Sequence, residues 1–113
     1  MVTEDDVRTA ALALPGTTEK RSYGTPGFRV RDKLFARIKE DGETLVAFCA
    51  DESEKLALIA EDPDRYFTTP HYDGYASVLV RLNTLDPDSL ADVLLDAWRA
   101  RAPQKLRDEL DAS

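Results

Sequence analysis

The sequence predicts an α+β domain in which a mainly antiparallel sheet carries N- and C-terminal helices packed on it. Apolar residues recur at helical spacing near both ends of the chain, whereas residues 28–49 and 75–82 alternate as strands do. The strands of the first half follow one another with only short turns between them, which favours hairpins. Consecutive strands flanked by helices are typical of the α+β class. A length of 113 residues fits a single domain over 1–113.

The first element is predicted to be a helix over 3–14. Thr3 is a good N-cap, and acidic residues in the first turn complement the helix dipole. The apolar stripe that follows has i, i+3, i+4, i+7 spacing and consists of Val7, Ala10, Ala11 and Leu14. Pro15-Gly16 then ends the helix.

A short strand over Lys20–Tyr23 and a turn or bulge over 24–27 precede a β-hairpin of residues 28–39. If Phe28 and Val30 face the core, directly opposed residues must share their face, so Val30 should pair with Leu34 and Phe28 with Ala36. This register leaves a three-residue loop over 31–33. The outer face would then carry Arg29, Phe35, Arg37 and Lys39, with Arg31 and Lys33 at the tip.

Asp41-Gly42 predicts a second hairpin turn, followed by a central strand over 43–49 that is apolar on both faces. Asp51 can cap a helix over 52–60. The inward-pointing residues of that helix are expected to be Leu56, Ile59 and Ala60.

Asp62-Pro63 predicts a turn or short helix through Phe67, followed by a loop over 68–74 and a strand over 75–82. Asp86 with Pro87 at the first position begins the clearest helix, which Ala102-Pro103 breaks. A weaker helix over 104–110 ends the chain.

The charge is unevenly distributed. The whole chain has a net charge of −7, but residues 20–39 hold seven basic side chains and one acidic side chain. The remainder therefore carries a net charge of −13. A strongly acidic total disfavours non-specific binding to nucleic acid, because neutralising phosphates requires local Lys and Arg. The basic hairpin is the one segment that could provide them.

Several classes of protein are disfavoured. Apolar runs are far too short to span a bilayer, and the N-terminus lacks a secretory signal, so no membrane association is expected. The single cysteine, Cys49, excludes an internal disulfide and favours a cytoplasmic location. The acids that follow Cys49 would raise its pKa, which disfavours a nucleophile. His71 is the only histidine, and no further histidine or cysteine lies near it at the spacing of a metal site. We therefore expect no cofactor, no metal and no enzymatic activity.

Several segments together resemble the MmcQ/YjbR family of small bacterial proteins. They are L-P-G-T-T-E at 14–19, S-Y-G-T-P-G-F-R-V at 22–30, K-L-F-A-R at 33–37, D-P-D-R-Y-F-T-T-P-H-Y at 62–72 and D-A-W-R at 96–99. The resemblance covers nearly the whole chain and implies a two-layer sandwich similar to the frataxin/CyaY fold. It also implies a DNA-binding role. Asp32 departs from the small residue that is common in the family's hairpin turn.

Two functions follow as hypotheses. In the first, the basic hairpin binds DNA through Arg21, Arg29, Arg31, Lys33, Arg37 and Lys39, with Phe35 as a wedge or stacking group. The competing interpretation of this charge is a solvated face whose basic residues pair with the acidic helices, with Phe35 buried under a helix or a partner. In the second, the domain binds a protein or a small anionic ligand in an aromatic cleft formed by Tyr66, His71, Tyr72, Arg81 and Trp98. Ordinary core packing of these aromatic residues is the alternative to that cleft.

Overall fold

A computed structural model describes residues 2–22 and 24–112. Its helices are α1 (Glu4–Leu12), α2 (Glu52–Glu61), α3 (Pro87–Arg101) and α4 (Gln104–Ala112), with a 3-10 turn at Leu82–Thr84. Its strands are β1 (Thr17–Ser22), β2 (Thr25–Val30), β3 (Lys33–Ile38), β4 (Thr44–Phe48), β5 (Tyr66–Phe67) and β6 (Ser77–Arg81). The predicted α+β class is confirmed.

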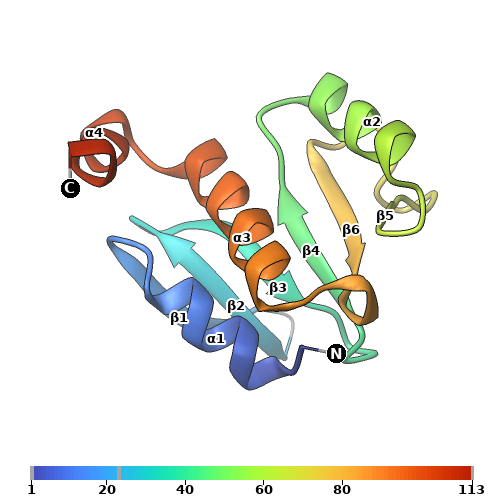
Figure 1. Ribbon diagram of the computed structural model, residues 1–113, viewed down its shortest axis with the longest axis horizontal. Helices are drawn as coiled ribbons and strands as arrows, with labels where there is room; N and C mark the ends of the chain where they lie inside the picture. The colour runs from blue at the N-terminus through green and yellow to red at the C-terminus, as the bar shows by residue number, and fades with distance from the viewer. Residues whose placement is uncertain (1, 23, 113) are drawn as a thin grey trace.

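The sheet is antiparallel throughout and has the strand order β1-β2-β3-β4-β6-β5. Helices α1 and α3 lie side by side on one face of the sheet, which we call the helical face (Figure 1). We call the opposite face the open face. Helix α2 lies at the β5–β6 end of the sheet, and α4 lies beyond the C-terminal end of α3 (Figure 1). No helix within the described residues is long and apolar enough to cross a membrane.

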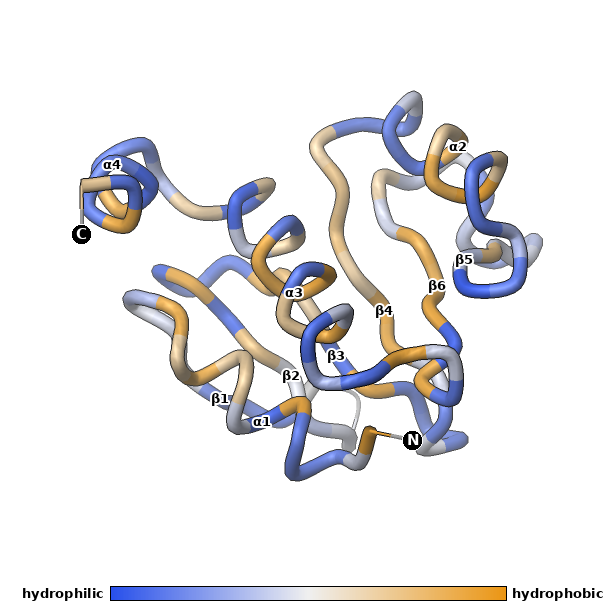
Figure 2. The backbone as a smooth tube through the Cα atoms, viewed as in Figure 1, coloured by the Kyte–Doolittle hydropathy of each residue, from blue (hydrophilic) through white to orange (hydrophobic). Residues whose placement is uncertain are grey.

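The main core lies between the sheet and the helices α1 and α3. Apolar residues concentrate along β4, β6 and α3, whereas α4 is largely hydrophilic (Figure 2). Trp98 of α3 is fully buried in this core, and its indole Nε1 donates a hydrogen bond to the carbonyl of Pro15 at 2.9 Å. The bond satisfies the one polar atom of the ring and ties α3 to the end of the α1 segment.

The three predicted caps are confirmed. At the start of α2 the Asp51 carboxylate accepts a hydrogen bond from the Glu54 backbone N–H at 2.8 Å. The Thr3 hydroxyl accepts a hydrogen bond from the Asp6 backbone N–H, and the Asp6 carboxylate accepts one from Thr3 in return. Asp86 and Ser89 form the same reciprocal pair at the start of α3, with Pro87 in its first turn. Caps can be predicted because they depend on residues only three positions apart.

The β1–β2 connection is shorter than expected. Ser22 pairs with Thr25, so Pro26 and Gly27 belong to β2 and not to a turn over 24–27. Strand β1 also begins earlier than predicted, at Thr17, and forms one edge of the sheet along its whole length. Tyr23, the last residue of the predicted strand, lies outside the described residues.

The predicted register of the β2–β3 hairpin is wrong at its tip. Val30 pairs with Lys33, which leaves the two-residue loop Arg31-Asp32. Both loop residues have positive φ, 50° and 67°, as a tight hairpin turn of this length requires. The predicted pairing of Phe28 with Ala36 is nevertheless confirmed.

A β-bulge reconciles the two pairings. Arg29 pairs with Leu34, but Phe28 pairs with Ala36, so Phe35 is an extra residue in β3. The bulge turns Phe35 into the core, where its side chain is 0% exposed, and leaves Leu34 on the open face. The predicted outer position of Phe35 is therefore wrong, and this residue cannot serve as a wedge for DNA. The alternative expectation, that Phe35 is buried beneath a helix, is confirmed.

Because Asp32 occupies a left-handed conformation, replacing it with glycine should stabilise the protein. The steric strain of about 1 kcal/mol at a non-glycine residue would be relieved. Part of that gain is offset because glycine gives the unfolded chain more conformational entropy. We expect Asp32→Gly to raise the free energy of unfolding by about 0.5 kcal/mol in urea titrations. Asp64→Gly, at an exposed turn residue without positive φ, is the control and should not stabilise. A lower stability for Asp32→Gly would contradict the tight turn.

Helix α2 also differs from the prediction in the face that it buries. Leu56 is 55% exposed and Ala60 is exposed as well, whereas Ile59 packs against the core as expected. The residue of α2 that is fully enclosed is Lys55, with 1% exposure. Its burial is possible because its ammonium group meets backbone carbonyls, as described below.

Candidate binding surface on the open face of the sheet

Strand alternation places basic residues on the open face of β1, β2 and β3. Gly27 pairs with both Lys20 and Arg37, and Arg29 pairs with Leu34, so these side chains share one face. Lys39 follows the core residue Ile38 and lines the same pocket as Arg37. The open face therefore carries Lys20, Arg29, Arg37 and Lys39, which we call the basic face.

Few acids neutralise the basic face. Within residues 2–22 and 24–112, Arg37 is the one basic side chain of the hairpin that forms an ion pair, with Glu40 at 3.3 Å. The expectation that the hairpin's basic residues pair with the acidic helices is thus not met. One ion pair between a helix and a strand does form, but in it the helix supplies the cation. Arg8 of α1 binds Glu19 of β1 at 2.6 Å on the helical face. The hydrogen bond from Arg8 lowers the pKa of the Glu19 carboxyl.

A pocket of about 570 Å³ adjoins the basic face. Val46 and Phe48 of β4 contribute apolar wall, and His71 and Tyr72 of the loop that precedes β6 contribute aromatic wall. Arg37 and Lys39 supply the cationic side. The rings of His71 and Tyr72 meet edge to face, with centroids 5.2 Å apart.

Three cations hold Tyr72 in place. Arg37 Nη2 donates to the Tyr72 hydroxyl at 2.8 Å, and Lys39 Nζ lies 5.3 Å from the centre of the ring. Beneath the loop, the buried Lys55 Nζ donates to the backbone carbonyls of Tyr72 and, at 3.1 Å, Tyr75. The loop is thus fastened through side chain and backbone together, which positions its aromatic rings before any ligand arrives.

A second hollow, of about 450 Å³, lies on the other side of His71 and Tyr72, next to the C-terminal end of α3. Arg101 reaches it from the last turn of α3. The Arg101 guanidinium lies over the ring of Phe48, 4.8 Å from its centre, and Nε donates to the carbonyl of Leu34 at 3.1 Å. Phe48 and Tyr72 line both hollows, so the two are neighbours.

The six basic residues predicted to bind DNA do not form one surface. Arg29, Arg37 and Lys39 lie on the basic face, whereas Arg21 alternates to the helical side and donates to the carbonyl of Gly24. Lys33 pairs with the core residue Val30, and it is exposed beside the turn. The last of the six, Arg31, lies in the turn itself, close to Gly16.

The predicted aromatic cleft is not formed. Trp98 belongs to the core, and Tyr66 packs half-buried on the helical side, where burial raises the pKa of its hydroxyl. Arg81 lies over the ring of Phe67, 4.2 Å from its centre, and donates to two backbone carbonyls of the preceding turn. Of the five residues, His71 and Tyr72 alone share a pocket.

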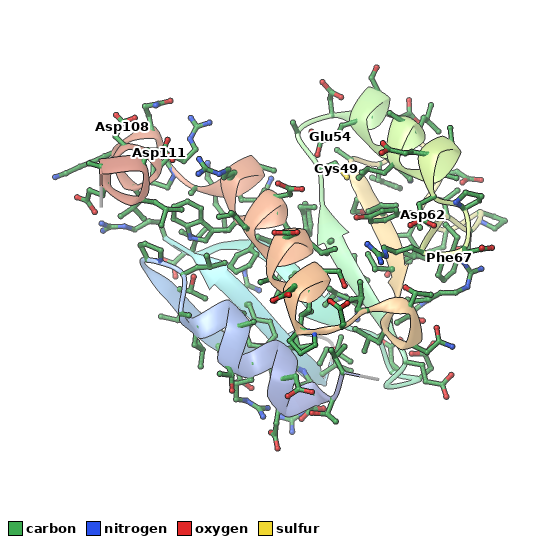
Figure 3. All side chains as sticks on the ribbon, viewed as in Figure 1. Cys49, Glu54, Asp62, Phe67, Asp108 and Asp111 are labelled. Carbon is green, nitrogen blue, oxygen red and sulfur yellow. The ribbon has the colours of Figure 1, made fainter. Side chains whose placement is uncertain are left out.

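Cys49 has the environment of a structural cysteine. Its side chain is buried at the end of β4, with Glu54 of α2 nearby (Figure 3). Burial, followed by the charge of Glu54, raises the pKa of the thiol to about 12, so it is protonated at neutral pH. The expected direction of this shift is confirmed. Among the described residues, no group of three or more His, Cys, Asp or Glu side chains could hold a metal ion.

Three residues of the site were not predicted from the sequence: Phe48, Lys55 and Arg101. Phe48 was expected to alternate with the core residues, but nothing local indicated its neighbours. Arg101 keeps helical spacing with the apolar stripe of α3, which is a signal that its side chain points toward the sheet. Lys55 sits four residues before Ile59, on the same helical face, and that spacing is the corresponding signal for its burial.

Comparisons with known proteins agree with the architecture. The family model described as YjbR matches residues 12–100. Two curated relatives, uncharacterized proteins Mb2600 of Mycobacterium bovis and Rv2570 of Mycobacterium tuberculosis, are each 37% identical over 123 residues, covering 94% of this chain and 93% of the relative.

A solved structure, Deinococcus radiodurans protein DR2400 with its DUF419 domain, has the same fold. Its TM-score is 0.71 at 22% identity, over 98% of this chain and 89% of the other. The family model spans most of the chain, and the mycobacterial relatives match nearly all of it. This chain belongs to the YjbR family.

Proposed function

We propose that this protein binds single-stranded DNA on the basic face. The observation that carries the proposal is the juxtaposition of cations with few carboxylate partners and aromatic rings in an open pocket. Proteins that bind single strands combine a basic surface, which follows the backbone, with aromatic side chains on which bases stack. Lys20, Arg29 and Lys39 would contact phosphates, and Tyr72 with His71 would stack on a base.

The geometry favours a single strand over a duplex. The tip of the hairpin is a tight two-residue turn, and Arg31 lies close to Gly16, so the tip offers no long basic wing for a groove. Cations on a sheet face, next to the exposed His71 ring and the partly exposed Tyr72 ring, suit unpaired bases whose faces are accessible. The net charge of −7 opposes the approach of any polyanion, and the local positive field of the basic face has to overcome it.

The proposal assigns no chemical step to the protein. Cys49 is protonated at neutral pH and buried. His71 contacts Tyr72, and among the described residues no carboxylate forms an ion pair with its ring. We therefore propose a non-enzymatic binding role. A cytoplasmic location, which the single cysteine favours, is part of the same proposal.

Fluorescence anisotropy with a labelled single-stranded oligonucleotide of about 20 nucleotides tests this function. Three phosphate contacts at roughly −0.7 each predict that log K falls with log salt with a slope of about −2. The double variant Arg29→Ala/Lys39→Ala should weaken binding by about tenfold or more at low salt, because it removes two of the three contacts.

The matched control is Arg99→Ala/Lys105→Ala, which removes the same charge from α3 and α4, away from the basic face. It should bind the oligonucleotide as the wild type does. A duplex of the same sequence should bind more weakly than the single strand. Absence of saturable binding at low salt, or equal weakening in both double variants, would refute the proposal.

A further inference from the structure

The hollow at the C-terminal end of α3 adjoins the pocket beside the basic face and shares Phe48, His71, Tyr72 and Ser77 with it. Its wall holds one cation, Arg101, and that side chain is fixed at two points. The Nε–H group is bonded to the carbonyl of Leu34, and the guanidinium plane lies over Phe48. Among the described residues, Arg101 forms no ion pair, so its remaining N–H groups have no carboxylate to neutralise them.

Carboxylates are absent from the described lining of this hollow, although the chain has 22 acidic residues. The other ionisable groups in its wall are His71, Cys49 and two tyrosines. A helix C-terminus disfavours an anion through its dipole, but that effect corresponds to about half a charge, which the full charge of Arg101 exceeds. Arg101 therefore gives the wall of the hollow a full positive charge that can bind an anion, although Glu54, Asp51 and Asp96 act on Cys49 from behind the wall.

The opposite wall is aromatic and held in place. Tyr72 and Tyr75 come from the loop that Lys55 fastens from beneath by donating to both of their carbonyls. Tyr75 is 65% exposed, which is unusual for so large a ring and leaves its surface available to a ligand. A volume of about 450 Å³ lies in the range of pockets that take small organic molecules.

We propose that this hollow binds a small planar aromatic anion, whose negative group is bound by Arg101 and whose ring packs against Tyr72 and Tyr75. Nucleoside monophosphates and free aromatic carboxylates both have this chemistry. Planar, forked hydrogen bonding to phosphate or carboxylate is what arginine provides and lysine does not. The inference does not rest on the proposed binding of single-stranded DNA, since Arg101 and Tyr75 are not needed for that function; Tyr72 is common to both.

NMR titration of the ¹⁵N-labelled protein tests the site with four probes: AMP, indole-3-acetate, adenosine and inorganic phosphate. AMP, indole-3-acetate or both should give saturable shifts centred on residues 71–77 and 100–101. Adenosine lacks the charge and phosphate lacks the ring, so each should bind at least about tenfold more weakly than the aromatic anions. Binding of AMP alone identifies a nucleotide site, and binding of indole-3-acetate alone identifies a carboxylate site. If neither AMP nor indole-3-acetate gave saturable shifts, the proposal would be overturned.

Arg101→Gln should weaken binding of the anion by about tenfold or more, because a charge-assisted hydrogen bond is lost. Arg99→Gln is the matched control on the same helix, and its exposed ion pair with Asp111 lies outside the hollow. Tyr75→Ala gives a second variant whose exposed side chain the fold does not need. If Arg99→Gln weakened binding as much as Arg101→Gln, or Tyr75→Ala had no effect, the assigned site would be wrong. Oligonucleotide binding by Arg101→Gln, measured separately, distinguishes failure of this site from failure of the proposed function.

Discussion

Replacing Phe35 with alanine is expected to lower the free energy of unfolding by about 3–5 kcal/mol. The side chain is 0% exposed, and the bulge in β3 points it into the core between the sheet and the helices. Removal of the ring leaves a cavity that neighbouring side chains can fill only in part. Urea denaturation followed by circular dichroism measures the change directly.

Leu34→Ala is the matched comparison, because the neighbouring residue lies on the open face beside the pocket. Its loss should cost about 1 kcal/mol or less, since the leucine is partly exposed. A regular hairpin without the bulge would exchange the two positions and make Leu34→Ala the costlier change. Equal costs, or the reversed order, would therefore contradict the bulge.

Replacement of Lys55 by methionine should release the loop of residues 69–76. The ammonium group is the donor for the carbonyls of Tyr72 and Tyr75, and methionine fills a similar volume without donating. Hydrogen bonds from a charged donor contribute about 1.5–3 kcal/mol, so we expect a loss of about 2 kcal/mol in stability. Hydrogen–deuterium exchange should show faster amide exchange in residues 69–76 of the variant than in the wild type, with exchange in the strands much less affected.

Lys105→Met is the control for the charge itself, because this lysine is exposed on α4. It should change stability by less than about 0.5 kcal/mol and leave the exchange of the loop unchanged. Burying the ammonium group of Lys55 costs free energy, so an apolar methionine can offset part of the stability that is lost with the hydrogen bonds. The exchange of the loop is therefore the decisive measurement: unchanged exchange in Lys55→Met would show that the lysine does not fasten the loop.

Features determined by neighbouring residues could be predicted from the sequence. The caps at Thr3 and Asp86, the Asp41-Gly42 turn and the alternation of β4 and β6 depend on spacings of two to four residues. The order of elements then limited the class to α+β. The short strand β5 could not be foreseen, because two residues carry no periodic pattern.

The bulge could not be predicted because Leu34 and Phe35 are both apolar, and either could face the core. The tight turn decides between them, because it needs positive φ at Arg31 and Asp32. Neither residue type indicates that conformation in the sequence, as glycine would. Lys55 escaped for a related reason. A lysine is rarely enclosed, and only the distant carbonyls of Tyr72 and Tyr75 make its burial possible.

The candidate site was predictable in part. Alternation along β2 and β3 correctly placed Arg29, Arg37 and Lys39 on the face away from the core. The aromatic cleft failed because chain order does not say which side of a sheet a loop or helix will cover. Trp98 lies on the helical face, whereas Tyr72 crosses to the open face, and the sheet separates them.

The edges of the sheet bear on how the protein behaves in a crowded solution. One edge, β1, exposes a full strand, but Glu19, Lys20 and Arg21 alternate above and below it. A strand from another molecule could pair there only by stripping water from these charges. The other edge, β5, is only two residues long and offers little backbone to extend. Both edges thus resist the growth of intermolecular β-structure, so the fold has built-in protection against aggregation.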